Sequence, residues 1–399
     1  MKIKFNIDRN GCLYSFSSTD GHCEVIEEFI IPSKIKGREV SSIGQLTNSF
    51  RELRGIGVKK IENLIIEDGI KFINNYAFSN IKLEIDNFYW PTSCTEIPAF
   101  CFDGSYIERV KGIENVKFVG KDAFSRTQRL IEINWPQHCF QIPAECFSYS
   151  RIEKISGIEN VTQIKKSAFA TTDLKSFTWP KGCFSVPEKC FCDSILENIN
   201  GLEAVKTIGQ AAFANTNLKS IKWPTKCKHI PEGCFCNSPI KSISNINRVT
   251  RVSNSAFEKT KLKTIIWPTS CAEIPFCCFY NTPLKEIKEI DNVREIGEYA
   301  FARTNLKTIT WPSNCEKIPY NCFENSSLEE IIFSNYRGIK DIDLYNLYSF
   351  IYLSGNNIKK IDLSAVGAVN FIETRSNVDY KKLLEKMESI ICFPYYVIV

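Results

Sequence analysis

The sequence has few histidines, no phosphate-binding loop and no long apolar run. Among its 399 residues only His22, His138 and His229 are histidines, and the repeat described below places no serine, cysteine or carboxylate beside the last two as a catalytic partner. Its one Gly-x-Gly, Gly55-Ile56-Gly57, lacks the rest of a nucleotide-binding fingerprint. No segment approaches 18 consecutive apolar residues, so no membrane span is expected. These absences predict a protein without catalytic activity and without a cofactor.

What the sequence does contain is a repeat of fixed length. All six tryptophans lie in Trp-Pro pairs at intervals of 45, 44, 44, 44 and 44 residues, at Trp90, Trp135, Trp179, Trp223, Trp267 and Trp311. A phenylalanine preceded alternately by alanine and cysteine recurs twice as often, at Phe78, Phe102, Phe124, Phe147, Phe169, Phe191, Phe213, Phe235, Phe257, Phe279, Phe301 and Phe323. The true period is therefore 22 residues. Repeats of this kind form solenoids, because each one buries its apolar face only against its neighbours.

Each coil contains one segment that favours a strand. After the phenylalanine a polar turn leads into Leu-x-x-Ile-x, as in Leu174–Thr178 and Leu218–Lys222, and this spacing predicts one short strand per coil. The Ala-Phe or Cys-Phe segment is expected to form a turn or a short helical piece on the opposite side. We predict an α/β repeat fold, a curved leucine-rich-repeat solenoid of about 12 coils in 44-residue double units, with a parallel sheet on its concave face.

The details of the repeat point to one family. The segment Ile31–Gly44, followed by coils of the form I-P or W-P, x-x-V/C-x-x-I-x-x-x-A/C-F, resembles the BspA-like leucine-rich repeats over roughly residues 20–335. The sequence departs from that pattern by placing tryptophan before the proline and cysteine where valine, alanine or serine is usual. The resemblance implies a ligand-binding or adhesion scaffold, as in bacterial surface proteins and microbial parasites, with no catalytic residues to carry over. A shared scaffold does not determine the ligand.

The repeat sets the expected domain boundaries. Solenoid ends need atypical repeats to stay soluble, so we predict an N-terminal cap at residues 1–55, the array at 56–335, and degenerate repeats with a C-terminal cap at 336–399. Within the C-terminal part, apolar residues at helical spacing predict a helix over Asn377–Ile391, and Tyr395–Val399 is expected to form a final strand or an apolar plug.

The 18 cysteines follow the repeat, which argues against disulfides and metal. Twelve of them occupy two apolar columns that hold valine and alanine in the intervening coils, where cysteine behaves as a small apolar residue: Cys94, Cys101, Cys139, Cys146, Cys183, Cys190, Cys227, Cys234, Cys271, Cys278, Cys315 and Cys322. Members of one column are separated by two coils, about 9–10 Å, which exceeds the roughly 7 Å Cα limit for a disulfide. Pairs within one coil remain open. No cysteines have the two-to-four-residue loop of a zinc site.

Free thiols imply a reducing compartment. The stretch Met1–Asn10 alternates charged and apolar residues and lacks a signal-peptide core. We therefore expect a cytoplasmic protein. The alternative is the cell surface, reached by a non-classical route, as the family resemblance implies.

The candidate binding residues lie on the predicted concave sheet. The first x of Leu-x-x-Ile-x is lysine in five consecutive coils, and neighbouring positions add two more lysines, so the predicted partner-binding residues are Lys219, Lys241, Lys263, Lys285, Lys307, Lys222 and Lys288. Like charges on adjacent strands destabilise a sheet slightly. A solubility device and an acidic binding partner both remain explanations for the column. The Trp-Pro row is a second candidate surface, although an internal packing role is favoured.

These features leave three readings of function. The first is a non-catalytic scaffold that binds a macromolecule, most plainly a protein with an acidic surface, through the lysine column. The second is a binder of polyanions or nucleic acid through the same column, which a net charge of only +5 and the lack of interleaved aromatic residues disfavour. The third is self-association through the sheet edges or the apolar tail.

Overall fold

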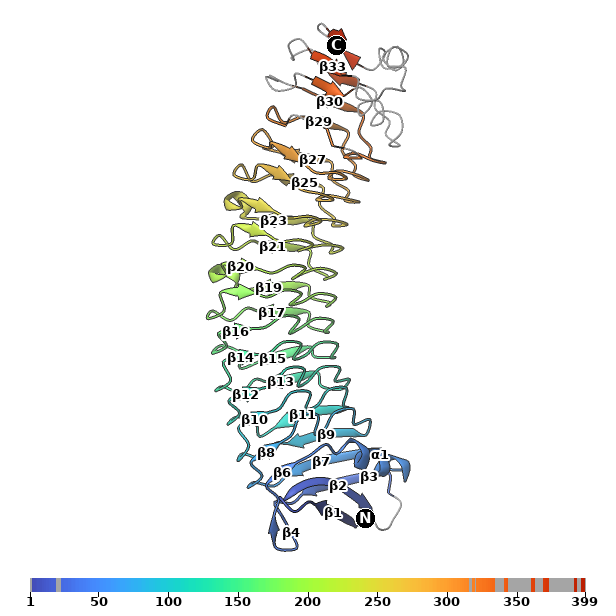
Figure 1. Ribbon diagram of the computed structural model, residues 1–399, viewed down its shortest axis with the longest axis vertical. Coiled ribbons are helices and arrows are strands. Elements are labelled where there is room, and N and C mark those ends of the chain that lie inside the picture. The colour runs from blue at the N-terminus through green and yellow to red at the C-terminus, as the bar shows by residue number, and fades with distance from the viewer. Residues whose placement is uncertain are drawn as a thin grey trace. The chain divides into compact units, whose positions relative to one another are not determined.

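The computed structural model describes residues 2–18, 23–315, 318–319 and 321–333, and beyond these the backbone of five short strands. The chain divides into two compact units, Met1–Gly201 and Leu202–Val399, and each is a parallel β-solenoid (Figure 1). Together the units contain about twelve coils, in agreement with the repeat count from sequence. The predicted helix over Asn377–Ile391 lies outside the described residues, apart from its last residue, which belongs to a strand.

The first unit begins with strands that pair in a less regular way than those of the later coils. Strands β1 (Ile3–Ile7) and β2 (Cys12–Ser18) form an antiparallel pair, and β2 continues in parallel to β6 (Ser42–Ile43) and β8 (Phe72–Ile73). Strands β4 (Lys34–Ile35) and β5 (Arg38–Glu39) form a small hairpin. A parallel sheet of β3 (Val25–Ile31), β7 (Lys60–Ile66), β9 (Glu84–Tyr89) and β11 (Ile107–Lys111) lies beside helix α1 (Thr47–Gly55).

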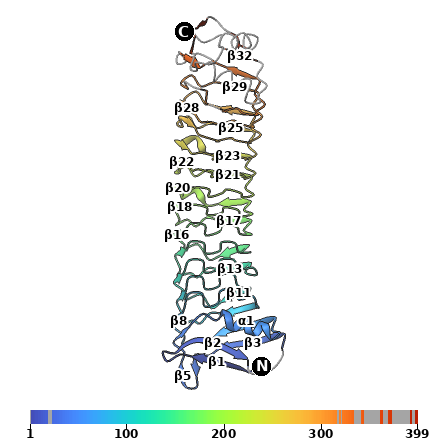
Figure 2. The same cartoon turned by 45° about the vertical axis from the view of Figure 1, so that its right-hand side comes forward.

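The remaining coils of the first unit carry two strands each, on different sides of the coil (Figure 2). One ladder consists of β13 (Glu132–Asn134), β15 (Lys154–Ser156), β17 (Ser176–Thr178) and β19 (Asn198–Asn200). The other consists of β10 (Glu96–Ile97), β12 (Phe118–Val119), β14 (Gln141–Ile142), β16 (Gln163–Ile164) and β18 (Ser185–Val186). The sequence analysis predicted one strand per coil, which was wrong, because the Ile column of the second ladder was not recognised as a strand position.

The second unit repeats this arrangement. Its longer strands are β21 (Ser220–Lys222), β23 (Ser242–Ser244), β25 (Thr264–Ile266), β27 (Glu286–Lys288), β29 (Thr308–Thr310), β30 (Glu330–Ile332), β32 (Lys360–Asp362) and β34 (Ile391–Cys392). The shorter ladder has β20 (Thr207–Ile208), β22 (His229–Ile230), β24 (Arg251–Val252), β26 (Glu273–Ile274) and β28 (Glu295–Ile296), and β31 (Asp341–Asp343), β33 (Val369–Ile372) and β35 (Tyr396–Ile398) form a further sheet. The terminal strand predicted near Tyr395–Val399 is thus confirmed as β35.

Helices are few in the described residues. Besides α1 there are two short 3₁₀ segments, η1 (Leu202–Ala204) and η2 (Ile246–Arg248). The predicted α/β repeat is therefore a parallel β-solenoid in which helices have a minor part.

The phenylalanine column forms the core of each unit. In the second unit the rings of Phe235, Phe257 and Phe279 stack with centroids 6.1 and 5.5 Å apart and interplanar angles of 5° and 15°. All three side chains are fully buried. Each backbone N–H donates to the residue before the phenylalanine of the next coil, as from Phe257 to the Cys278 carbonyl at 3.1 Å. The Ala-Phe or Cys-Phe segment is therefore a turn, one of the two conformations predicted for it.

Buried hydroxyl groups complete the phenylalanine turns from Phe102 to Phe301. The hydroxyl of Thr260 donates to the Phe257 carbonyl at 2.9 Å, and Ser238 and Thr282 do the same in neighbouring coils. A buried carbonyl without a partner is costly, which explains the serine or threonine three residues after each phenylalanine from Phe102 to Phe301; after Phe78 this position holds Ile81.

The Trp-Pro row is internal. The six tryptophans are at most 3% exposed. The Trp267 indole N–H donates to the Cys271 carbonyl at 3.1 Å, and its ring meets Phe279 edge to face at 5.8 Å. A tryptophan row that binds carbohydrate or peptide on the surface is therefore excluded, and the internal packing role is confirmed.

The glycines that follow the tryptophans by one coil have a backbone reason. Gly112 has a φ of +77°, and an added Cβ would lie 2.5 Å from the Trp90 carbonyl oxygen. Glycine is thus required because the backbone is left-handed here and passes too close to the backbone of the preceding coil to leave room for a Cβ atom.

We expect Gly112→Ala to lower the free energy of unfolding by more than about 1 kcal/mol, because alanine is strained at positive φ and its Cβ would meet the Trp90 carbonyl. Gly55→Ala is the matched control, since no atom lies within 4 Å of its added Cβ. Chemical denaturation of both variants gives the comparison. Equal stability of the two variants would contradict this explanation.

The twelve column cysteines lie buried in the core, as predicted. Every cysteine side chain that the structure describes is a free thiol. Burial raises the pKa of the deepest thiols, such as Cys234 and Cys278, well above its ordinary value, and raises the pKa of Cys183 to about 11. The thiolate, which is the reactive form, is therefore disfavoured in the folded protein.

Candidate functional site: the lysine face

The five-lysine column lies at the start of the longer strands of the second unit. In each coil a buried leucine or isoleucine precedes the lysine, and a buried or half-buried isoleucine follows two residues later, as in Leu262, Lys263 and Ile265. The five lysines are exposed. We name the surface formed by Lys219, Lys241, Lys263, Lys285, Lys307, Lys222 and Lys288 the lysine face.

Backbone hydrogen bonds align the lysines of two pairs of neighbouring coils. The Lys241 N–H donates to the Lys219 carbonyl at 2.8 Å, and the Lys285 N–H donates to the Lys263 carbonyl at 2.7 Å. The strands that follow pair in register, with Ile221 opposite Ile243 and Ile265 opposite Ile287. At about 4.8 Å per strand, the five lysines form a row about 20 Å long.

The row has a defined end. The Glu329 N–H donates to the Lys307 carbonyl at 2.8 Å, so a glutamate occupies the next position of the column.

The two members of the lysine face that lie outside the five-lysine column, Lys222 and Lys288, differ in their surroundings. Lys222 lies opposite Ser244 and is exposed. Lys288 forms an ion pair with Glu286 at 3.2 Å, and both side chains are more than half exposed. Such an exposed pair contributes little to stability. Lys288 is thus the one member of the lysine face whose charge is partly compensated within the described residues.

The five lysines of the row have no acidic partner in the described part of the chain. The residue after the lysine carries a small hydroxyl side chain in four coils, at Ser220, Ser242, Thr264 and Thr308, and is Glu286 in the fifth. The one large apolar side chain on this surface is Ile266, which is 58% exposed and lies opposite Lys288. The lysine face therefore combines uncompensated positive charge, small hydroxyl groups and one apolar contact.

The corresponding strands of the first unit show the opposite situation. The Arg129 guanidinium contacts Asp86 at 3.2 Å and Glu108 at 2.7 Å, and lies 3.2 Å from Glu84. The Lys60 ammonium lies 2.6 Å from Asp86, and this hydrogen bond raises the pKa of Lys60. Charges on that sheet pair with one another. The uncompensated row is therefore a property of these particular coils and not of the repeat itself.

One histidine has a partner that sequence reasoning missed. His229 Nε2 lies 2.8 Å from the Ser253 hydroxyl, so the prediction that no serine lies beside it was wrong. His229 lies in β22 and Ser253 directly follows the adjacent strand β24, and the sequence analysis did not consider the register of these two strands. Partial burial, and then the Arg251 charge, lower the pKa of His229. No carboxylate completes a catalytic arrangement with this pair among the contacts of the described residues.

The shorter ladder of the first unit exposes aromatic residues that sequence reasoning also missed. Phe118, Phe140 and Phe184 are each 50–55% exposed. Sequence analysis missed them because it did not recognise the shorter strand of each coil. The Ile column of that strand is the sequence signal that could have identified them.

Within the described residues no group of three or more histidine, cysteine, aspartate or glutamate side chains is placed to hold a metal ion. None of the helices in that part of the chain has the length and apolar character that a bilayer crossing requires.

Comparison with known proteins agrees with the solenoid. The model of the BspA type leucine rich repeat region matches in six copies, at residues 56–174, 162–284 and 265–390. No match was found among curated proteins.

Three solved structures are similar along nearly their whole length. A leucine-rich repeat protein from Bacteroides ovatus is 20% identical, with a TM-score of 0.60, over 100% of this chain and 98% of that chain. The pneumococcal vaccine antigen PcpA is 18% identical (TM-score 0.48, 100% and 96% covered), and a leucine rich cell surface protein from Faecalibacterium prausnitzii is 18% identical (TM-score 0.40, 98% and 97% covered). Of these three, the Bacteroides ovatus structure supports the solenoid fold of this chain, and the fold alone.

Proposed function

We propose that this chain, which belongs to the BspA-type leucine-rich repeat family, is a non-catalytic scaffold that binds an acidic protein through the lysine face. The observation that supports this most is the row of five exposed lysines, one at the same position of each of five consecutive coils, without an ion pair among the described residues; backbone hydrogen bonds align two pairs of them. A row of like charge slightly destabilises the sheet. An acidic partner would remove that repulsion on binding.

The surroundings of the row favour a protein over nucleic acid. The hydroxyl side chains beside the lysines are short, so a partner can approach the backbone closely, and Ile266 offers an apolar contact at one edge. Single-stranded nucleic acid is bound with aromatic side chains on which bases stack. The described residues of the lysine face include no aromatic side chain.

Affinity capture tests the proposal. Wild-type protein, the triple variant K241E/K263E/K285E and a control of equal charge change, K226E/K228E/R294E, are immobilised and exposed to source-cell lysate with and without nuclease. The control residues are exposed and lie outside the lysine face. We expect acidic proteins retained by wild type and control, insensitive to nuclease, and lost from the triple variant. Equal retention by all three, or loss on nuclease treatment, would contradict the proposal.

We further propose that the protein works in a reducing compartment, the cytoplasm being the simplest, because the described cysteines are free and their buried members have raised thiol pKa values. Native protein should therefore react slowly with a thiol reagent at pH 8, and denatured protein should show about 18 thiols. Mostly disulfides, in protein isolated under conditions that prevent oxidation, would place it instead at the cell surface.

The same thiols predict a loss of stability in alkali. Because the pKa is raised in the folded state, the folded protein holds these protons at pH values where the unfolded chain releases them, so stability falls as pH rises above about 9. Denaturation midpoints between pH 8 and pH 10 should fall more for wild type than for Cys234→Ala/Cys278→Ala. An equal fall in both proteins would assign the effect to other groups.

A further inference from the structure

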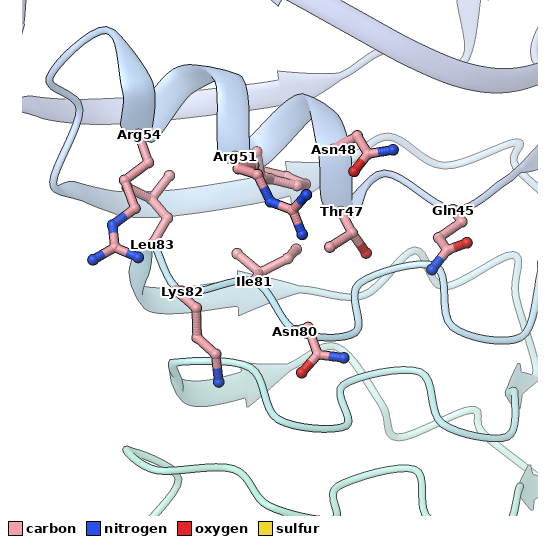
Figure 3. Close-up of a pocket in the computed structure, with 10 residues that line it drawn as sticks. Gln45, Thr47, Asn48, Arg51, Arg54, Asn80, Ile81, Lys82 and Leu83 are labelled. Atoms are coloured by element: carbon pink, nitrogen blue, oxygen red, sulfur yellow. The ribbon is translucent and has the colours of Figure 1, made fainter.

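A polar cavity of about 470 Å³ lies between helix α1 and the segment leading into β9 in the first unit (Figure 3). Arg51 and Arg54 descend from the helix toward this space, and Lys82 comes from the opposite segment. The charged side chains that line the cavity are all basic, because none of the described residues that line it is a carboxylate.

The local fold holds the two arginines on one side of the cavity. Residues three apart on a helix share a face, so Arg51 and Arg54 are neighbours. Phe50 and Leu53, each of which directly precedes one of the arginines, are 1% exposed and attach the helix to the core. The Phe50 ring meets Phe16 edge to face at 4.9 Å. The guanidinium groups therefore extend from a fixed helix.

The positive charges at the cavity are largely unused inside the protein. Neither arginine forms an ion pair or a side-chain hydrogen bond with any described residue. The Lys82 ammonium donates to the Gly104 carbonyl at 2.7 Å and lies 4.8 Å from the centroid of the Tyr106 ring, so its position is fixed while its charge is not neutralised. Three cations around one cavity repel one another unless an anion is bound.

The uncharged lining suits a ligand with hydroxyl groups. Asn48 and Asn80 are exposed and present amides that both donate and accept. Thr47 donates its hydroxyl hydrogen to the Ser79 carbonyl at 2.7 Å, which leaves its oxygen free to accept. Buried Ile81 and Leu83 give an apolar wall. A volume of about 470 Å³ lies within the range of roughly 300–1,000 Å³ typical of small-molecule sites, which is far more room than an inorganic ion needs.

We infer that this cavity, which we name the basic pocket, binds a small hydroxylated anion, namely a sugar carrying a sulfate, phosphate or carboxylate group. Arg51 and Arg54 hold the charged group through paired N–H donors, a geometry that suits all three anions. The two asparagines and Thr47 hydrogen-bond the sugar hydroxyls, and Ile81 and Leu83 contact the apolar side of the ring. The basic pocket lies in the first unit and is independent of the lysine face.

Calorimetric titration of the full chain tests this inference with five probes: glucose 6-sulfate, glucose 6-phosphate, glucuronate, glucose and inorganic sulfate. We expect at least one charged sugar to bind with a submillimolar Kd, and both glucose and inorganic sulfate to bind at least tenfold more weakly. The ranking of the three charged sugars identifies the anionic group. Equal affinity for inorganic sulfate, or no binding of any charged sugar, would overturn the inference.

Two variants locate the binding. R51Q/R54Q changes exposed side chains only, and we expect it to weaken the charged sugar at least tenfold with an unchanged melting temperature. R248Q/R294Q removes two exposed arginines elsewhere and should bind as wild type does. R51K retains the charge without the paired donors and should bind with intermediate affinity. Equal weakening by R51Q/R54Q and R248Q/R294Q would show a general charge effect and overturn the assignment to this cavity.

Discussion

Replacing Phe257 by alanine is expected to lower the free energy of unfolding by roughly 3–5 kcal/mol. The Phe257 ring is fully buried between Phe235 and Phe279, so its removal leaves a cavity that neighbouring coils cannot fill without moving. Chemical denaturation provides the measurement. Phe276→Ala is the control, because that ring is 44% exposed and its loss should cost much less.

Hydrogen exchange adds a spatial test to this prediction. Stability in a solenoid is approximately a sum of terms between neighbouring coils, so exchange in Phe257→Ala should accelerate first in the coils that hold Phe235 and Phe279. Acceleration confined to distant coils would contradict the phenylalanine register.

The second large effect concerns binding. We expect K241E/K263E/K285E to reduce the affinity for the captured acidic partner at least tenfold, because three attractive charges become repulsive within one row. Thermal stability should stay nearly unchanged, since the three side chains are exposed and form no ion pair within the described residues. Surface plasmon resonance with the purified partner gives the affinity, with K226E/K228E/R294E as the control of equal charge. Unchanged affinity in a folded triple variant would make the lysines a solubility device.

Much of the fold could be predicted because a solenoid repeats its local rules. The intervals between phenylalanines predicted the coil length, and the alternation of cysteine with valine or alanine identified core positions that the structure buries. The lysine column was predictable for the same reason, since a position in the repeat determines both exposure and alignment. Its role in binding stays a proposal.

The features that sequence reasoning missed depend on contacts that no single coil contains. The second strand has only two residues per coil, as in His229–Ile230, which is too short to produce a recognisable alternation. Its pairing with the next coil brings Ser253 to His229, and the glycine at 112 reflects the approach of the Trp90 carbonyl from another coil. The basic pocket joins α1 to a segment some 30 residues away, outside the regular repeat. Periodicity contains no information on such a contact.

The salt dependence of the association rate with the acidic partner tests the central claim most directly. Attraction between exposed charges weakens as the Debye length falls, from about 10 Å at 0.1 M salt to about 3 Å at 1 M, and electrostatic steering acts mainly on association. We predict that the wild-type and control proteins lose association rate steeply as salt rises, while K241E/K263E/K285E associates slowly at every salt concentration. Equal rates and equal salt dependence for all three proteins would contradict binding through the lysine face.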